Sequence, residues 1–275
     1  MNHGFIDLPG IKNARDLGGY PAGGKRIKEG ALLRCGTLCK AEPGTLELLS
    51  DKYQVKHIID FRMEETPGTI PDPEVKDAKI SVLPVVEMED YIIKAGKPEL
   101  AQQYLSAAGS KDPQALYKMA YEYGMLSPEM YLLFLFGERG KKAYREFFKI
   151  LISHDPSDGA VLWHCEDGKD RAGIATVLIL EVLGTDRATI IEDYLLTNIG
   201  NEAKISKTRA ACEASGMPPE QTEAMIFANG GVFKHYLTFT LDTIERKYGS
   251  VTDYIRQELG ITDEEMNVLR EKYTI

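Results

Sequence analysis

The strongest constraint on this chain comes from residues 160–183. An apolar run at 160–163 is followed by a short polar segment, and residues 171–183 are then apolar on almost every side. A helix without a polar face is stable only when it is buried. A short apolar run bounded by turn residues predicts a buried strand. The chain must therefore form a core in which this strand and this helix pack together.

The rest of the sequence predicts the layers around that core. Apolar runs at 31–35, 55–61 and 79–84 are typical of short strands, and 45–51 of a short helix. Strands separated by helices favour βαβ units and a parallel sheet. Residues 85–140 contain no good strand and are rich in Tyr and Met, which indicates a helical insertion. Residues 186–275 have an almost entirely helical pattern. We therefore predict an α/β fold with a small, mostly parallel central sheet flanked by helices.

Composition excludes several functional classes. The 275 residues include 33 basic and 42 acidic side chains, a formal net charge of −9, with no concentrated basic patch, so we expect no nucleic-acid partner. No apolar run approaches the about 18 residues of a membrane span, so we expect no transmembrane segment. The first ten residues lack the pattern of a secretory signal. We expect a cytoplasmic location, with signal-less secretion as the open alternative.

Four cysteines are too few for a disulfide scaffold. Cys35, Cys39 and Cys212 read as buried, reduced thiols. Cys165 differs because it ends the apolar strand and is followed six residues later by Arg171, where the buried helix begins. Neither Cys35, Cys39 nor Cys212 has an arginine at that spacing.

The physical chemistry of this Cys-x5-Arg loop favours an anion site. A loop that closes onto a helix N-terminus turns backbone N–H groups inward, and the helix dipole adds to their positive field. The same field stabilises a thiolate. The planar guanidinium of Arg171 can bind two phosphate oxygens. A thiolate beneath a bound phosphate is placed to attack phosphorus, and water can then hydrolyse the phosphocysteine without a metal or another cofactor.

The segment His164-Cys165-Glu166-Asp167-Gly168-Lys169-Asp170-Arg171-Ala172-Gly173 resembles the phosphate-binding loop of the protein tyrosine phosphatase superfamily. It is most similar to the bacterial tyrosine/serine and phosphoinositide phosphatase branch, whose loop reads His-Cys-x-x-Gly-Lys-Asp-Arg-Thr-Gly. Further pieces match that branch at 13–20, 33–36 (with Cys35 in place of Ser), 58–62, 193–198 and 248–251. The resemblance implies a single phosphatase domain over 1–275, with 85–140 as an insertion that forms a lid over the site.

The resemblance also implies roles for residues. Cys165 is the expected nucleophile, Arg171 the phosphate ligand, and Asp170 the general acid, with Asp60 as the alternative acid. Substrate binding is expected from Glu166, Asp167, Gly168, Lys169 and Asp60; the two acidic loop residues either tune selectivity or face outward. Lys169 is expected to read extra phosphate charge and His164 to orient the loop. The family usually has Thr or Ser where this chain has Ala172, so we expect slower breakdown of the phosphocysteine, unless another donor assists.

These features predict a cysteine-dependent phosphatase that hydrolyses phosphate monoesters, namely phosphotyrosine and also phosphoserine or phosphothreonine. Two alternatives stay open. A lysine inside the loop is similar to the loops of lipid phosphatases, which indicates phosphoinositide substrates. A non-catalytic phosphoprotein-binding module would keep the anion site without turnover. The partners expected are therefore a phosphorylated protein or a phosphoinositide.

Overall fold

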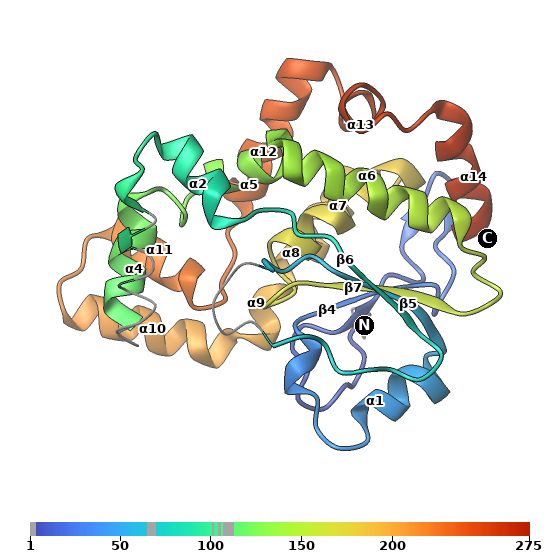
Figure 1. The fold of residues 1–275 in the computed structure, drawn as a ribbon, viewed down its shortest axis with the longest axis horizontal. Helices are drawn as coiled ribbons and strands as arrows, with labels where there is room; N and C mark the ends of the chain where they lie inside the picture. The colour runs from blue at the N-terminus through green and yellow to red at the C-terminus, as the bar shows by residue number, and fades with distance from the viewer. Residues whose placement is uncertain (1–3, 65–69, 101, 104–105, 107–112) are drawn as a thin grey trace.

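A computed structural model of the chain describes residues 4–64, 70–100, 102–103, 106 and 113–275 (Figure 1). Its centre is a five-stranded sheet in the order β1-β4-β7-β5-β6. The edge strand β1 is antiparallel to β4, and the other neighbours are parallel, which confirms the predicted mostly parallel sheet. The strands of this sheet are β1 (Arg15–Asp16), β4 (Leu32–Cys35), β5 (Val55–Asp60), β6 (Lys79–Val82) and β7 (Ala160–His164). A separate hairpin pairs β2 (Pro21–Ala22) with β3 (Lys25–Arg26).

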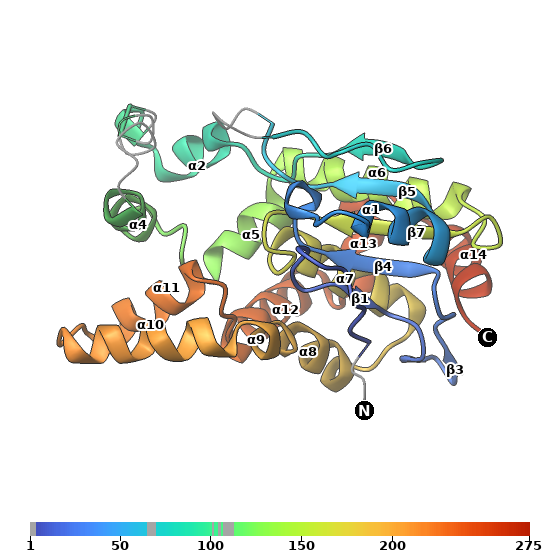
Figure 2. The same ribbon diagram turned by 90° about the horizontal axis from the view of Figure 1, so that it is seen from below.

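Helices cover both faces of the sheet, as Figures 1 and 2 show. On one face lie α1 (Thr45–Glu47) and the π-helical turn η2 (Leu48–Lys52), preceded by the 3₁₀ turn η1 (Leu38–Lys40). On the other face lie α6 (Glu138–Ser153) and α7 (Arg171–Leu183), with the C-terminal helices outside them. The remaining helices are α2 (Met88–Ala95), α4 (Pro113–Glu122), α5 (Glu129–Phe136), α8 (Arg187–Leu195), α9 (Thr197–Gly200), α10 (Glu202–Ala214), α11 (Pro219–Ala228), α12 (Lys234–Tyr248), α13 (Val251–Leu259) and α14 (Asp263–Tyr273).

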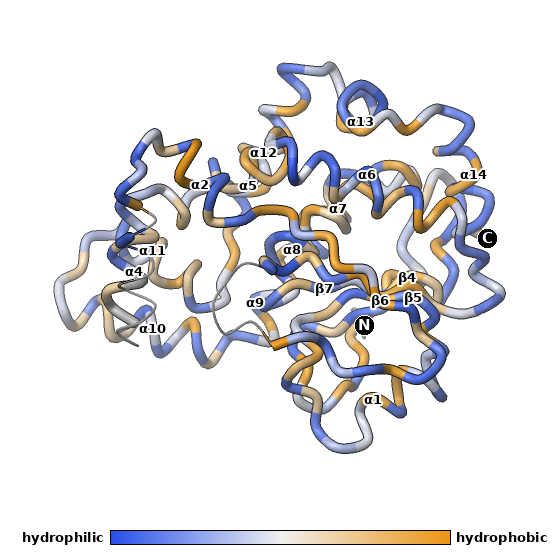
Figure 3. The backbone as a smooth tube through the Cα atoms, viewed as in Figure 1, coloured by the Kyte–Doolittle hydropathy of each residue, from blue (hydrophilic) through white to orange (hydrophobic). Residues whose placement is uncertain are grey.

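Two apolar cores follow from this layering. The larger core lies between the sheet and the α6–α7 layer and includes Trp163 and Phe147, whose rings meet edge to face at 5.3 Å. The smaller core lies under α1 and η2 and contains Leu33, Ile58 and Leu162. Alternate side chains of one strand enter opposite cores, because successive residues of a strand point to opposite faces. The tube of Figure 3 is accordingly apolar along α7 and more hydrophilic along outer helices such as α13.

The strand register brings the carboxyl ends of three parallel strands together. His164 of β7 pairs with Cys35 of β4 on one side and with Asp60 of β5 on the other. Cys165 comes directly after β7, so the Cys-x5-Arg loop begins at this shared edge. Ligand sites of open α/β sheets form at this kind of edge. Figure 2 shows that α2, α4, α10 and α11 lie beyond it.

The predicted insertion divides into two parts. Helices α2 and α4 carry a small apolar cluster of their own, centred on Leu100, Met119 and Met125. Helix α5 instead belongs to the main core, where Tyr131 and Phe134 are buried. Tyr91 of α2 packs against both clusters and joins them. Among the described residues, no helix combines the length and apolar content needed to cross a membrane.

His57, near the start of β5, generates a prediction about acid stability. Burial, together with the charges of Lys79 and His154, lowers the pKa of His57 from 6.5 to about 4. The folded protein therefore keeps His57 neutral, whereas the unfolded chain binds a proton below about pH 6.5. The contribution of neutral His57 to the free energy of unfolding is therefore fully present above about pH 6.5, and it is lost as the pH falls from about 6.5 to 4.

In the His57→Gln variant this part of the acid sensitivity should disappear. Because His57 is only partly buried, we expect the difference in unfolding free energy between pH 7 and pH 4.5 to shrink by about 1–2 kcal/mol. Urea unfolding at both pH values measures it, with His235→Gln at an exposed position of α12 as the control. Equal acid sensitivity in the wild type and His57→Gln would contradict the assignment.

Candidate active site

The loop from Cys165 to Arg171 leaves its backbone donors free. Cys165 is 2% exposed, the following five residues have no regular structure, and α7 begins at Arg171. Within the described parts of the chain, no group accepts a hydrogen bond from the backbone N–H groups of residues 166–171. These donors at a helix N-terminus form the kind of concavity that binds an anion.

Two of the loop carbonyls, in contrast, are bound by other segments of the chain. The backbone N–H of Thr37 donates to the Glu166 carbonyl over 3.0 Å. The Gly168 carbonyl accepts from Arg34 Nη2 at 2.7 Å and from Asn13 Nδ2 at 3.0 Å. Since a peptide N–H and its neighbouring C=O point in opposite directions, tethering the carbonyls outside turns the N–H groups inward.

Gly168 itself cannot carry a side chain here. Its φ is +66°, and a Cβ at this position would lie 2.4 Å from the Cys35 carbonyl oxygen. The loop can therefore pack against the end of β4 only with glycine at this position. Gly168, which the sequence predicted as a substrate-binding residue, therefore allows the loop backbone to pack against β4.

Two buried arginines lie behind the loop. Arg34 and Arg15 are 1% and 0% exposed, and both pair with Asp193 of α8, at 2.7 Å and 3.6 Å. Burial lowers the pKa of Arg15 to about 10, against the opposing charge of Asp193. Two guanidinium groups against one carboxylate leave a net positive charge beneath the anion site. This charge favours a phosphate in a chain that is acidic overall.

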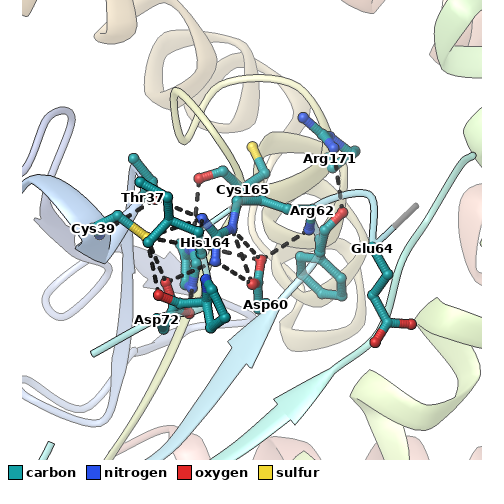
Figure 4. Close-up of polar contacts among 12 residues, drawn as sticks. Thr37, Cys39, Asp60, Arg62, Glu64, Asp72, His164, Cys165 and Arg171 are labelled. Carbon is teal, nitrogen blue, oxygen red and sulfur yellow. Dashed lines mark hydrogen bonds and ion pairs between the residues drawn. The ribbon is translucent and has the colours of Figure 1, made fainter. Parts of the chain in front are cut away.

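Cys165 and Arg171 lie at the mouth of the loop. In Figure 4 the Cys165 sulfur points to the side of Arg171, away from the polar network around His164. The Arg171 guanidinium reaches the Phe61 carbonyl oxygen over 3.5 Å. Burial acts to lower the pKa of Arg171, but the negative charges of Cys165, Asp170 and Asp60 outweigh it and raise the pKa above its usual value. The geometry thus brings together the two residues that the sequence singles out.

A second network lies below the loop (Figure 4). His164 Nε2 is 2.6 Å from Asp72 Oδ2, and its Nδ1 is 3.3 Å from the Cys165 carbonyl oxygen. Arg62 bridges Asp60 and Asp72, donating from Nη2 at 2.7 and 2.9 Å. The ligand atoms of Asp60, Asp72 and His164 lie within 4.8 Å of one another, the spacing of a metal site. Because Arg62 already balances both carboxylates, we interpret the cluster as an ion-pair network.

Asp60 is therefore placed differently from the sequence-based expectation. Its carboxylate accepts from the backbone N–H, Nε and Nη2 of Arg62 and is 4% exposed. Burial alone would raise the pKa of Asp60, but the hydrogen bonds from Arg62 and the nearby His164 lower it below the usual value. An ionised, fully bonded carboxylate is a poor proton donor and repels phosphate. In this arrangement Asp60 orders the strand end rather than facing a substrate.

The other loop side chains point in three directions. Glu166 is exposed and 3.4 Å from Lys40, and Asp167 is 3.7 Å from Lys12, so both acidic residues face outward. The Lys169 ammonium is buried, donates to the Phe227 carbonyl over 2.6 Å and lies 3.6 Å from the centre of the Phe227 ring. Lys169 is thus bound to the C-terminal end of α11, away from the position expected for a ligand of extra phosphate charge.

Asp170 remains at the loop rim. Its side chain is 19% exposed, and its Oδ1 accepts a hydrogen bond from the Tyr131 hydroxyl at 2.8 Å. Its Oδ2 lies 3.5 Å from the Lys169 ammonium. Asp170 is therefore partly accessible, and a buried hydroxyl and a buried ammonium fix its two carboxylate oxygens.

Sequence reasoning missed several residues that hold this site. Asn13, Arg34 and Asp193 stand in segments that the resemblance covers. The contacts of Asn13 and Arg34 with the loop, and of Asp193 with Arg34, were not foreseen. Asp72 lies between two prolines with no periodic pattern around it, and nothing in the sequence marks it. Cys39, expected to be buried, is half-buried beside Arg62, whose Nη1 is 3.2 Å from its sulfur.

Comparison with known proteins agrees with this geometry. A model of the tyrosine phosphatase family matches residues 6–275. The chain belongs to the tyrosine phosphatase family. It is 26% identical to the triple specificity protein phosphatase PtpB of Mycobacterium tuberculosis, over 96% of this chain and 97% of that protein. It is 28% identical to a protein of Cupriavidus necator that is provisionally named a tyrosine-protein phosphatase, over 91% of this chain and 82% of that protein. A tyrosine-protein phosphatase of Nostoc commune is 29% identical over 41% of this chain and 38% of its own length.

The buried arginines generate a stability prediction. In Asp193→Asn, Arg15 and Arg34 lose the carboxylate that balances them, and breaking a buried ion pair on one side costs about 3–5 kcal/mol. Urea unfolding should show a loss of that size, whereas Glu192→Gln, at an exposed neighbouring position of α8, should change stability by less than about 0.5 kcal/mol. Equal stability of the two variants would show that Asp193 is not needed to balance the arginines.

Proposed function

We propose that this protein hydrolyses phosphate monoesters through a phosphocysteine formed on Cys165. The observation that carries the proposal is the ring of unbonded N–H groups at residues 166–171, with Cys165 and Arg171 at its mouth. Membership of the tyrosine phosphatase family supports the same chemistry. The loop N–H groups and Arg171 bind the three terminal phosphate oxygens, which leaves phosphorus facing the thiolate.

The reaction proceeds in two displacements. In the first, the Cys165 thiolate attacks phosphorus, the P–S bond forms, the P–O bond to the leaving group breaks, and Asp170 gives its proton to the leaving oxygen. In the second, water attacks phosphorus, the P–S bond breaks, and the Asp170 carboxylate takes a proton from that water. Arg171 and the N–H groups stabilise the charge on the phosphoryl oxygens in both steps.

For the substrate we favour phosphorylated proteins, with phosphotyrosine and also phosphoserine or phosphothreonine as targets. The name of the M. tuberculosis relative as a triple specificity protein phosphatase supports a broad range. A phosphoinositide with several phosphates needs additional cations at the loop. Lys169, the loop cation that suggested this alternative, donates to the Phe227 carbonyl. Lys169 therefore gives less support to a lipid substrate than its position in the sequence suggests.

We further propose that residues 1–275 act as one phosphatase domain in which α2, the first helix of the predicted 85–140 insertion, covers the loop as a lid, while α5 of the same insertion belongs to the main core. Tyr91 of α2 is the supporting residue, because its hydroxyl is close enough to Arg171 and Asp170 to interact with their charges. Burial raises the pKa of this hydroxyl, so Tyr91 stays neutral near the phosphate site. A cover of this kind excludes water from the reacting phosphate.

The covalent mechanism predicts separate effects on turnover and binding. Cys165→Ser should abolish hydrolysis of an aryl phosphate, because a hydroxyl is a far weaker nucleophile than a thiolate. The same variant should still bind inorganic phosphate or vanadate, because the N–H groups and Arg171 are intact. Steady-state assays and calorimetric titration measure the two properties. Normal turnover in Cys165→Ser would exclude a phosphocysteine.

The residue at 172 predicts the rate of the second step. The family usually has a hydroxyl there to assist the leaving sulfur. In this chain Ala172 is buried, and within the described residues no hydroxyl is hydrogen-bonded to the Cys165 sulfur. The hydroxyl of Thr176 donates to the Ala172 carbonyl instead, at 2.9 Å. Phosphocysteine breakdown should therefore be slow relative to its formation.

Rapid mixing with an aryl phosphate should accordingly show a burst of leaving group in the wild type. Ala172→Thr restores the hydroxyl, and one hydrogen bond to a charged group is worth about 1.5–3 kcal/mol, or about ten- to a hundredfold in breakdown. Ala172→Val is the matched control, since it has the shape of Thr without the hydroxyl. The absence of a wild-type burst, together with equal turnover of Thr and Val variants, would mean that another group already assists the sulfur.

A further inference from the structure

Asp170 is held from behind by a chain of buried hydroxyl groups. The Tyr131 hydroxyl donates to Asp170 Oδ1 at 2.8 Å, and the Tyr194 hydroxyl lies 2.9 Å from that of Tyr131. Tyr131 is 0% exposed and Tyr194 2% exposed, so neither hydroxyl can exchange these partners for water. Tyr131 comes from α5 of the predicted insertion and Tyr194 from α8, so three distant segments meet at one loop carboxylate.

The direction of these hydrogen bonds follows from the contact with Asp170. The Tyr131 hydroxyl has a single proton and donates it to Asp170 Oδ1. The 2.9 Å contact between the two hydroxyl groups is therefore made by the proton of Tyr194, which Tyr131 accepts. Oδ1 is thereby committed as an acceptor. When Asp170 is protonated, its proton belongs on Oδ2, the oxygen that does not face Tyr131.

The ring contacts keep this arrangement in place. Tyr131 meets Tyr194 and Phe227 edge to face, with ring centres 6.3 and 6.2 Å apart. The Phe227 carbonyl and ring bind Lys169, whose ammonium is 3.5 Å from Asp170 Oδ2. Both oxygens of Asp170 are thus positioned from one aromatic cluster, and the carboxyl group cannot rotate without breaking a buried contact.

We propose that Tyr131 is a positioning residue that fixes the Asp170 carboxyl group so that its proton, on Oδ2, faces the leaving oxygen. This inference rests on the proposed function of Asp170 as the general acid and adds the group that orients it. In the first displacement the Oδ2–H bond breaks, its proton passes to the leaving oxygen as the P–O bond breaks, and Asp170 is left as a carboxylate. Tyr131 keeps its own proton throughout and stabilises that carboxylate through the hydrogen bond to Oδ1.

The test uses the dependence of kcat/KM on the leaving group. This ratio reports the steps up to phosphocysteine formation, so slow breakdown of the intermediate does not affect it. A general acid matters most when the leaving oxygen is strongly basic, as in phenyl phosphate, and least when it is weakly basic, as in dinitrophenyl phosphate. The variants are Asp170→Asn, Tyr131→Phe, the double variant, and Tyr194→Phe as a milder change that leaves Tyr131 in place.

Tyr254→Phe is the matched control. Tyr254 is equally buried and its hydroxyl donates to the Leu135 carbonyl of the same helix α5, but it does not contact the loop. We expect Tyr131→Phe to lower kcat/KM for phenyl phosphate by about tenfold or more and for dinitrophenyl phosphate by less than about threefold. Tyr194→Phe should show the same trend more weakly, and Tyr254→Phe should follow the wild type. In the Asp170→Asn background, Tyr131→Phe should cause no further loss.

The outcomes separate the two proposals. If Asp170→Asn shows the wild-type dependence on the leaving group, Asp170 is not the acid and the proposed function of this residue fails. If kcat/KM depends more steeply on the leaving group in Asp170→Asn but not in Tyr131→Phe, Asp170 is still the acid and the positioning role of Tyr131 is overturned. An equal loss of kcat/KM with both substrates in Tyr131→Phe also overturns it, since this is the effect of a merely structural tyrosine.

Discussion

The hydrogen bond from Arg34 to the Gly168 carbonyl is the contact on which the rest of the site depends. It draws the carbonyl out of the loop at 2.7 Å and so leaves the neighbouring N–H groups to face the phosphate position. Arg34 can act there because Asp193 balances its charge in a fully buried environment. The carboxylate comes from α8, the arginine from β4 and the carbonyl from the loop after β7, so the anion site exists only in the folded chain.

This dependence explains why the C-terminal helices matter for the reaction. Helix α8 supplies Asp193 below the loop and Tyr194 beside it, and α11 supplies the carbonyl that binds Lys169. Helix α5, within the segment expected to be only a cover, supplies Tyr131 and lies in the main core. These helices therefore hold the loop residues and the side chains that support them. The N–H groups of the loop and Cys165 face the phosphate position instead.

The sequence alone predicted the parts of this structure that depend on local order. The strand, loop and helix at 160–183 were predictable because their apolar patterns are contiguous and the chemistry lies between them. The partners of single polar residues were not predictable. Lys169 binds the Phe227 carbonyl, which lies 58 residues away in the sequence, so packing between distant segments decides the partner of this buried charge. Asp60 pairs with the nearby Arg62, but the same arginine also binds Asp72, which the sequence does not mark.

The central claim is that phosphate is transferred to the Cys165 sulfur before it reaches water, and acid-quench peptide mapping tests it most directly. The protein is mixed with an aryl phosphate, quenched in acid within milliseconds and digested, and the phosphorylated peptide is located by mass spectrometry. The account predicts a phosphate on the peptide that contains Cys165, with the sulfur as its site. Phosphate on a histidine or a carboxylate, or turnover at the normal rate with no phosphorylated peptide at any quench time, would contradict it.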